Sequence, residues 1–323
     1  MLKINDLLPL NLQEEKIKFF ASGYTYNPQF VYEKEVNQTE LTQYGKPRWW
    51  PLMQAKWIAS RDAKNRLNSM SLVKNHQFIN QAEFNRLLED KLKIYQLDSQ
   101  YEIIFSKQFV SRISVNLKTQ QIKVQLPIQI QRDEVAAVIA HEIETHVLRQ
   151  ENSKKQIWHG KKKKFGLTSH MRTEEGLAVI NEMIIGGNTT AYKQAVNYIA
   201  TDLALHDSFA RVFAFYIQMW GDPERAWLWT VKKKRGLTDT SQKGAFTKDV
   251  VYFEGLLKVL RYLKKNHYNS RGLYVGKIDV DDIKKTNKHN SSSEIILPVF
   301  LRGDNLSNYQ TSVKALCAKH VWL

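Results

Sequence analysis

The chain has 323 residues, of which 43% are hydrophobic and 25% are charged. This mixture is typical of a folded globular protein with one large domain or two, and it excludes a largely disordered chain. Its 48 lysines and arginines exceed its 32 acidic residues by 16, which favours anionic partners such as acidic protein segments or nucleic acid.

Cys317 is the only cysteine, so neither an internal disulfide nor a cysteine-based metal cluster can form. No stretch approaches the roughly 18 apolar residues of a membrane span. The first residues include Asp6 and lack the apolar run of a signal peptide. We therefore expect a cytoplasmic protein without a transmembrane segment.

Residues 1–75 have no clear periodicity and are predicted to be an N-terminal extension of unknown role, before a catalytic domain at 76–323. Within the extension, Pro47 and Pro51 argue against a helix in the surrounding aromatic stretch. From 78 to 97 apolar residues recur at helical spacing, which predicts a helix.

The pattern then changes to the alternation typical of strands. Residues 101–105 are strand-like, and residues 113–117 and 122–126 alternate apolar with polar side chains. The polar residues 119–121 between the last two runs predict a hairpin, and hence a small antiparallel sheet before the next helix.

A strongly helical pattern begins at Asp133 and continues through Val147. The run Lys161–Lys164 is predicted to be an exposed loop. A second helix is expected to begin near Thr173 as its cap and to stop at Gly186-Gly187. Further helices are predicted over 189–206, 207–220, 223–233 and 247–265. The polar tract 284–293 is predicted to be a loop.

The strongest chemical signal is the segment from His141 to His146, with the sequence HEIETH. It is similar to the zincin pattern H-E-x-x-H, in which two histidines bind zinc and the glutamate is the general base. Five residues separate these histidines, so on a regular helix they would point about 140° apart instead of about 40°. A π-bulge between them would restore a shared face. We predict His141 and His146 as ligands of one Zn²⁺ ion and Glu142 as the general base.

A third ligand is expected about 30 residues later, from Glu174 or Glu175, which point about 100° apart on a helix. We assign Glu175, because the neighbouring Gly176 lets a second helix approach closely. Two imidazoles and a carboxylate leave one position of zinc for water. Glu174, Glu182 and Thr145 are predicted to surround the ligands, with Glu182 on the same helix face as Glu175.

Three segments together resemble the microtubule-associated tyrosine carboxypeptidase family (MATCAP) and its bacterial relatives with a Q-E-G-L-A motif. They are HEIETH at 141–146, EEGLA at 174–178 and GAFTKDVVY at 244–252, within a resemblance over roughly residues 80–300. The resemblance implies zinc binding by the two histidines and by the glutamate of E-G-L-A. Glu174 departs from the motif, which has glutamine at that position.

Motifs and resemblance together predict an α+β fold: a mainly helical, zincin-like metallopeptidase of the gluzincin type. The resemblance implies a zinc carboxypeptidase that removes a C-terminal aromatic residue, Tyr or Phe, from a peptide or protein, and the basic charge of the chain would suit an acidic C-terminal segment. Lys248, Tyr252 and Arg172 are candidates to bind the terminal carboxylate. An aromatic last residue would suit a pocket lined by some of Phe213, Tyr216 or Trp220, although such residues more often belong to the core.

Two alternatives remain open on the same residues. One is an aminopeptidase or endopeptidase, which uses the same zinc site but holds the substrate differently. The other is a catalytically inactive binding protein whose basic surface holds nucleic acid or a regulatory partner. Of these partners, nucleic acid is less favoured than a protein C-terminus.

Overall fold

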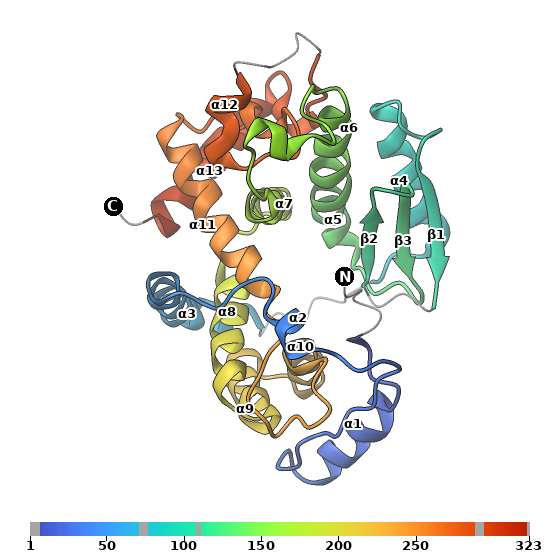
Figure 1. The fold of residues 1–323 in the computed structure, drawn as a ribbon, viewed down its shortest axis with the longest axis vertical. Coiled ribbons are helices and arrows are strands. Elements are labelled where there is room, and N and C mark those ends of the chain that lie inside the picture. Colours follow the sequence, from blue (N-terminus) through green and yellow to red (C-terminus); the bar gives the residue numbers. More distant parts are fainter. Residues whose placement is uncertain (1–6, 71–76, 108–110, 288–293, 322–323) are drawn as a thin grey trace. The chain divides into compact units, whose positions relative to one another are not determined.

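The computed structural model describes residues 7–70, 77–107, 111–287 and 294–321. These residues are mostly helical, with one three-stranded sheet, and the chain forms two compact units (Figure 1). Unit 1 contains residues 1–72 and 192–253, and unit 2 contains residues 73–191 and 254–323. Among the helices of the described segments, none has the length and apolar character needed to cross a membrane.

Unit 1 is helical and has an aromatic core. Phe19, Phe209, Phe213 and Trp227 are buried together there, with ring centroids 4.7–5.4 Å from that of Phe19. The helices predicted from 189 to 265 are present. The helices of this unit are α1 (Leu12–Ala21), α2 (Gln38–Leu41), α3 (Trp49–Met70), α8 (Tyr192–His206), α9 (Phe209–Trp220), α10 (Pro223–Lys234) and the first turn of α11 (Asp249–Lys265).

The structure agrees with one expectation for unit 1 and contradicts another. Phe213, Tyr216 and Trp220 are buried in the core, the more frequent role of such residues, and the Tyr216 hydroxyl donates to Asn197 at 2.7 Å. The prediction against a helix around Pro47 and Pro51 is wrong, because α3 starts at Trp49. Pro51 lies in its first turn, where a backbone N–H has no partner within the helix and its loss costs little.

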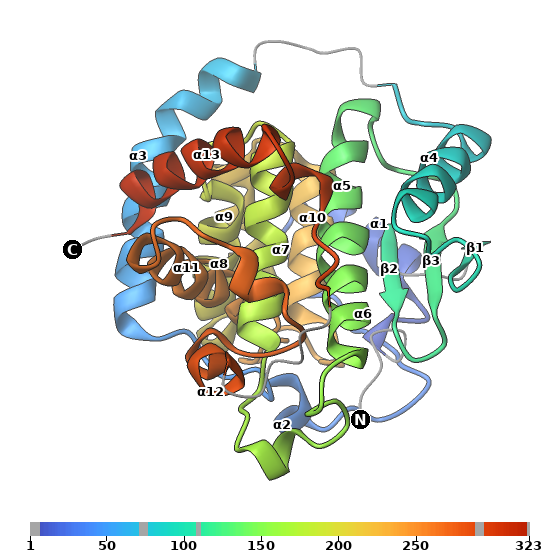
Figure 2. The ribbon, with the colours of Figure 1, turned by 90° about the horizontal axis from the view of Figure 1, so that it is seen from above.

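Unit 2 contains the sheet and the two helical segments that carry the predicted ligands. Among these elements α7 is central and is largely buried, with nine buried residues in its fifteen (Figure 2). The elements are α4 (Gln81–Ile94), β1 (Glu102–Ser106), β2 (Ile113–Asn116), β3 (Gln121–Gln125), α5 (Val135–His141), α6 (Leu148–Lys154), α7 (Met171–Ile185), α11 from Glu254 onward, α12 (Ile283–Asn287) and α13 (Asn305–His320).

The sheet is mixed, so the prediction of a purely antiparallel sheet is wrong. The predicted hairpin is present, with Ile113 opposite Val124 and Val115 opposite Ile122. β1, however, pairs in parallel with β3, which makes β3 the central strand. After β1 the chain forms β2 at the opposite edge of the sheet. β3 then occupies the position between them, antiparallel to β2 and therefore parallel to β1. Ile122 and Val124 are fully buried, as a central strand requires.

The ends of the ligand-bearing helices agree in part with the prediction. Gly186 ends α7, and Gly187 follows with a left-handed φ of +68°. Thr173 is not a cap, because α7 begins two residues earlier and the Thr173 hydroxyl donates to Asp279 at 3.0 Å. The predicted loop at Lys161–Lys164 contains a short 3-10 turn, Lys162–Phe165. Of the predicted loop at 284–293, residues 284–287 are helical and the rest lie outside the described residues.

Two glycines let α7 and α11 cross in close contact. A Cβ added to Gly176 would lie 2.2 Å from the backbone carbon of Gly255, and one added to Gly255 would lie 2.1 Å from the Arg172 carbonyl oxygen. Real Cβ atoms do not approach backbone so closely, so both positions exclude any side chain. Gly176 directly follows Glu175, so the close crossing fixes the position of the Glu175 backbone relative to α11.

We expect Gly176→Ala to destabilise the protein by about 3 kcal/mol or more, because the added methyl group forces two backbones apart. Denaturant unfolding followed by circular dichroism measures this change. Gly303→Ala is the matched control: a Cβ there meets nothing within 4 Å, and only the φ of +50° costs about 1–2 kcal/mol. Equal destabilisation by both substitutions would contradict the close crossing.

Candidate metal centre

The predicted π-bulge is present between the two histidines. α5 ends at His141, residues Glu142–Val147 form a π-helical turn, and α6 continues from Leu148. A π-turn joins residues five apart, whereas an α-turn joins residues four apart. His141 and His146 therefore share one face of the helix, with ring centroids 5.1 Å apart.

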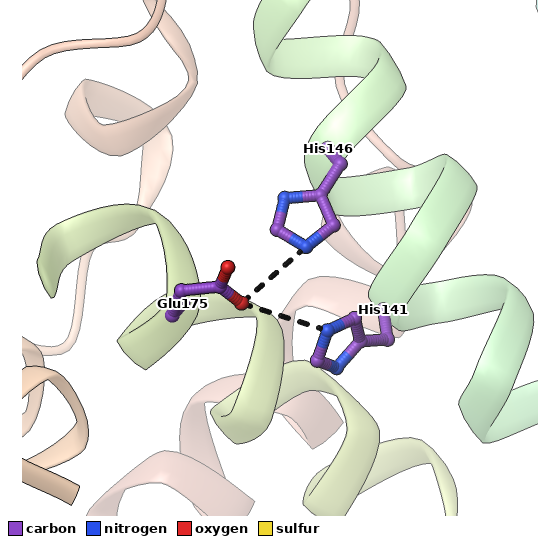
Figure 3. Close-up of side chains that lie close together, drawn as sticks. All are labelled: His141, His146 and Glu175. Atoms are coloured by element: carbon purple, nitrogen blue, oxygen red, sulfur yellow. Dashed lines mark ion pairs between the residues drawn. The ribbon is translucent and has the colours of Figure 1, made fainter. Parts of the chain in front are cut away.

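Glu175 on α7 completes a group of three side chains that could hold a metal ion. One ligand atom from each of His141, His146 and Glu175 lies within 4.8 Å of the others. The Glu175 Oε2 atom is 3.6 Å from Nε2 of His146 and 3.9 Å from Nε2 of His141 (Figure 3). This Oε2 atom is buried and has no hydrogen-bond partner among the residues that the structure describes. The three atoms thus converge without satisfying one another.

Each histidine is oriented by a carboxylate on its other ring nitrogen. Nδ1 of His141 lies 2.9 Å from Oε2 of Glu182, and Nδ1 of His146 lies 2.8 Å from Oε1 of Glu174. These contacts leave Nε2 of both rings directed toward Glu175. Glu174 and Glu175, which were alternative ligands from the sequence, therefore occupy different positions: only Glu175 faces both Nε2 atoms.

Two basic residues that the sequence did not single out hold Glu174. The fully buried Arg149 donates through Nη1 to Glu174 and through Nε to the Leu273 carbonyl at 2.8 Å. Nζ of Lys277 is 2.8 Å from Oε1 of Glu174. Arg149 follows His146 by three residues, which places the two on the same side of the helix, but no local pattern links Arg149 or Lys277 to Glu174.

Neighbouring charged side chains shift the pKa values of His141 and Glu174. Burial lowers the pKa of His141, but the hydrogen bond to Glu182 and the charges of Glu142 and Glu175 raise it to about 9. Burial raises the pKa of Glu174, but Lys277, Arg149 and the bond to His146 bring it well below its usual range. Glu174 is therefore ionised, and the acidic residues near His141 favour a bound cation.

The hydrogen bonds that the structure shows for Thr145 and Glu144 go to other residues than the two histidines. The Thr145 hydroxyl donates to the Ala140 carbonyl at 2.7 Å, five residues earlier, and accepts from Asn181 at 2.8 Å. Glu144 is buried and accepts a hydrogen bond from the Tyr95 hydroxyl. Glu142 is half-buried and adjoins His141 in the chain.

The three candidate carboxylate-binding residues fall in different units. Arg172 is on α7 in unit 2, where its Nε lies 3.2 Å from Oε2 of the buried Glu254. Lys248 and Tyr252 are in unit 1, with Nζ of Lys248 5.6 Å from the centre of the Tyr252 ring. Their role toward a substrate stays a prediction.

The family model of the microtubule-associated tyrosine carboxypeptidases (MATCAP) matches residues 44–317. The chain belongs to this family. The MATCAP match contains all the residues discussed in this section and begins within the stretch 1–75 that the sequence left without a role. The assignment of that stretch as an extension, and of 76–323 as the catalytic domain, stays a prediction.

MATCAP relatives align with nearly the whole chain. Microtubule-associated tyrosine carboxypeptidase 1 of Rattus norvegicus is 26% identical over 313 residues, 95% of this chain and 66% of the relative. The Homo sapiens protein of that name is 25% identical, over 97% of this chain and 67% of the relative. MATCAP2 of Mus musculus is 29% identical, over 91% of this chain and 57% of the relative. The chain therefore spans about 57–67% of these relatives' lengths.

A solved structure is also similar, though weakly. The similarity to a lipoprotein of Colwellia psychrerythraea covers 89% of this chain and 53% of the lipoprotein chain, with 11% sequence identity and a TM-score of 0.45. At this level the likeness does not define the fold. The family membership rests on the sequence matches alone.

Proposed function

We propose that the chain is a zinc-dependent carboxypeptidase with a zincin-like fold of the gluzincin type, which removes a C-terminal Tyr or Phe from a peptide or protein. The observation that carries the proposal is the convergence of His141, His146 and Glu175, with a buried carboxylate oxygen that no described residue meets with a hydrogen bond. Membership of the MATCAP family and the names of its members support the type of reaction.

The residues fit a zinc ion. Ligand atoms about 2.0–2.2 Å from a tetrahedral zinc lie about 3.3–3.6 Å from one another. The two measured separations from Oε2 of Glu175, 3.6 and 3.9 Å, are close to this range. Two histidines and one glutamate are also the ligand set of known catalytic zinc sites, in which the fourth position holds water. A bound zinc would polarise the scissile carbonyl and acidify that water.

The protein's own residues would then move the proton. Glu142 takes a proton from the attacking water, whose oxygen bonds to the carbonyl carbon of the scissile peptide bond. When the C–N bond breaks, Glu142 gives this proton to the leaving amine of the last residue. Arg172, Lys248 and Tyr252 are candidates to hold the substrate's terminal carboxylate by charge-assisted hydrogen bonds.

Peptides with free and amidated C-termini test the assignment. A peptide ending in Tyr or Phe should release this residue, and its amidated form should react at least about tenfold more slowly because one charge-assisted contact is lost. Equal cleavage of both forms would favour an endopeptidase, and release of the first residue would favour an aminopeptidase. A protein that binds no zinc and cleaves neither peptide would favour the binding-protein alternative.

Glu174→Ala is expected to weaken zinc binding about 10–100-fold, because the side chain that orients His146 is lost. Competition with a chelator of known zinc affinity measures the change, and circular dichroism checks that the variant is folded. Glu182→Ala is the matched control on His141; its effect should be smaller, because Glu182 has 26% of its side chain exposed against 6% for Glu174. Unchanged zinc affinity in Glu174→Ala would contradict its orienting role.

A further inference from the structure

Helix α3 in unit 1 is apolar on two opposite faces. One face, with Ala55, Ile58 and Ala59, is buried in the unit, where α3 lies along α8. The opposite face exposes three tryptophans and a methionine: Trp49 (62% exposed), Trp50 (68%), Met53 (41%) and Trp57 (40%). A surface helix of a globular protein normally has a polar outer face, so this face is unusual.

The exposed side chains form one continuous stripe. At 100° per residue, Trp49, Met53, Trp57 and Trp50 fall at about 0°, 40°, 80° and 100° around the helix axis. The rings of Trp49 and Trp50 are also in contact, with centroids 4.5 Å apart. A stripe about 100° wide is as broad as the face that a helix normally buries. Contiguous exposed apolar surface of this kind marks a binding surface.

Basic side chains border the stripe on both sides. Lys56 falls at about −20° and Arg61 at about 120°, just outside the two edges. The Arg61 guanidinium lies 4.3 Å from the centre of the Trp57 ring and is paired with Asp62. From residue 46 to residue 62 the sequence has four lysines and arginines and one acid, Asp62, which is itself buried. The partner expected for this surface is therefore apolar where it meets the stripe and carries a net negative charge.

We propose that the exposed α3 stripe, defined by Trp49, Trp50, Met53 and Trp57, binds the surface of an anionic phospholipid bilayer. Indole rings favour the boundary between headgroups and acyl chains, and lysine and arginine beside them attract lipid phosphates. A second copy of the chain is a poorer occupant, because an interface symmetric about this stripe would bring its basic borders together. This surface contains none of the residues of the metal centre.

Vesicle co-sedimentation with the full chain tests the proposal. We expect binding to vesicles of phosphatidylglycerol and phosphatidylcholine in equal parts, weaker binding to pure phosphatidylcholine, and a loss of binding as salt rises. Replacing the two most exposed indoles, by Trp49→Ala with Trp50→Ala, should weaken binding at least about tenfold. Lys56→Glu should weaken binding to the anionic vesicles only.

Two control variants test whether vesicle binding comes from non-specific apolar contacts or depends on the metal centre. Leu228→Ala removes a comparably exposed apolar side chain on α10 of the same unit and should leave vesicle binding unchanged. His146→Ala should also bind vesicles as the wild type does, and circular dichroism checks that each variant is folded.

Four results would overturn the proposal. The first is a wild-type protein that does not bind the anionic vesicles, and the second is equal binding by the double tryptophan variant. The third is a wild-type dimer that this variant converts to a monomer, which would mean that a second copy covers the stripe. Binding to polyglutamate that depends on the tryptophans, without binding to vesicles, would point instead to an acidic protein and would equally reject a bilayer.

Discussion

His146→Ala is expected to remove zinc from the protein and to abolish its peptidase activity. The substitution deletes one of three converging ligand atoms and leaves the ion held by His141 and Glu175 alone. A lost ligand should lower zinc affinity more than about hundredfold, since each contributes several kcal/mol to binding. Elemental analysis after dialysis measures bound zinc directly. Added zinc should also raise the melting temperature of the wild type but not of the variant.

The control for this experiment is His159→Ala, which removes an exposed histidine of the same unit. It should keep one zinc per chain and full activity. If His146→Ala also kept one tightly bound zinc, the ion would have to lie elsewhere, and the proposed ligand set would be rejected. The measurement does not depend on knowing the natural substrate, because zinc content is read without any substrate.

Glu142→Gln should keep zinc bound and lower turnover by about 10²–10⁴-fold. Glutamine has nearly the same shape as glutamate but cannot take a proton from water, and general base catalysis typically contributes a factor of this size. Because Glu142 is not one of the three converging residues, zinc content should stay at the wild-type value. Together the two results would separate metal binding from proton transfer.

A matched control for this second prediction is Glu102→Gln, the same substitution at an exposed position at the start of β1. It should leave both turnover and zinc content unchanged. If Glu142→Gln cleaved a peptide ending in tyrosine as fast as the wild type, another group would have to serve as base. Loss of zinc in Glu142→Gln would instead mean that this acid helps to hold the ion.

The converging residues could be predicted from the sequence because their signals are local. His141 and His146 differ from a known pattern by one residue, and the rule of 100° per residue sufficed to infer the π-bulge. The choice of Glu175 over Glu174 followed from the adjacent Gly176, and the structure directs Glu175 to both Nε2 atoms. Zinc binding by these residues stays a prediction.

The remaining surroundings could not be predicted, because they join segments far apart in the sequence. Lys277 and Arg149 meet at Glu174 only through the folding of the chain, and β1 pairs in parallel with β3 for the same reason. The missed helix α3 shows a different limit. A proline argues against a helix interior but is tolerated in a first turn, and the sequence alone did not distinguish these positions.

The π-helical turn has a consequence for how this histidine spacing relates to the four-residue one. At about 4.4 residues per turn, five π-helical residues sweep about 410°, nearly the same angle as four residues of an α-helix. A chain one residue shorter at this point would therefore present the same histidine pair, and everything after it, in almost unchanged orientation. Insertion or deletion here changes the length of the motif without rotating the rest of the helix. The hydroxyl of Thr145, which reaches back five residues to Ala140, stabilises the longer version.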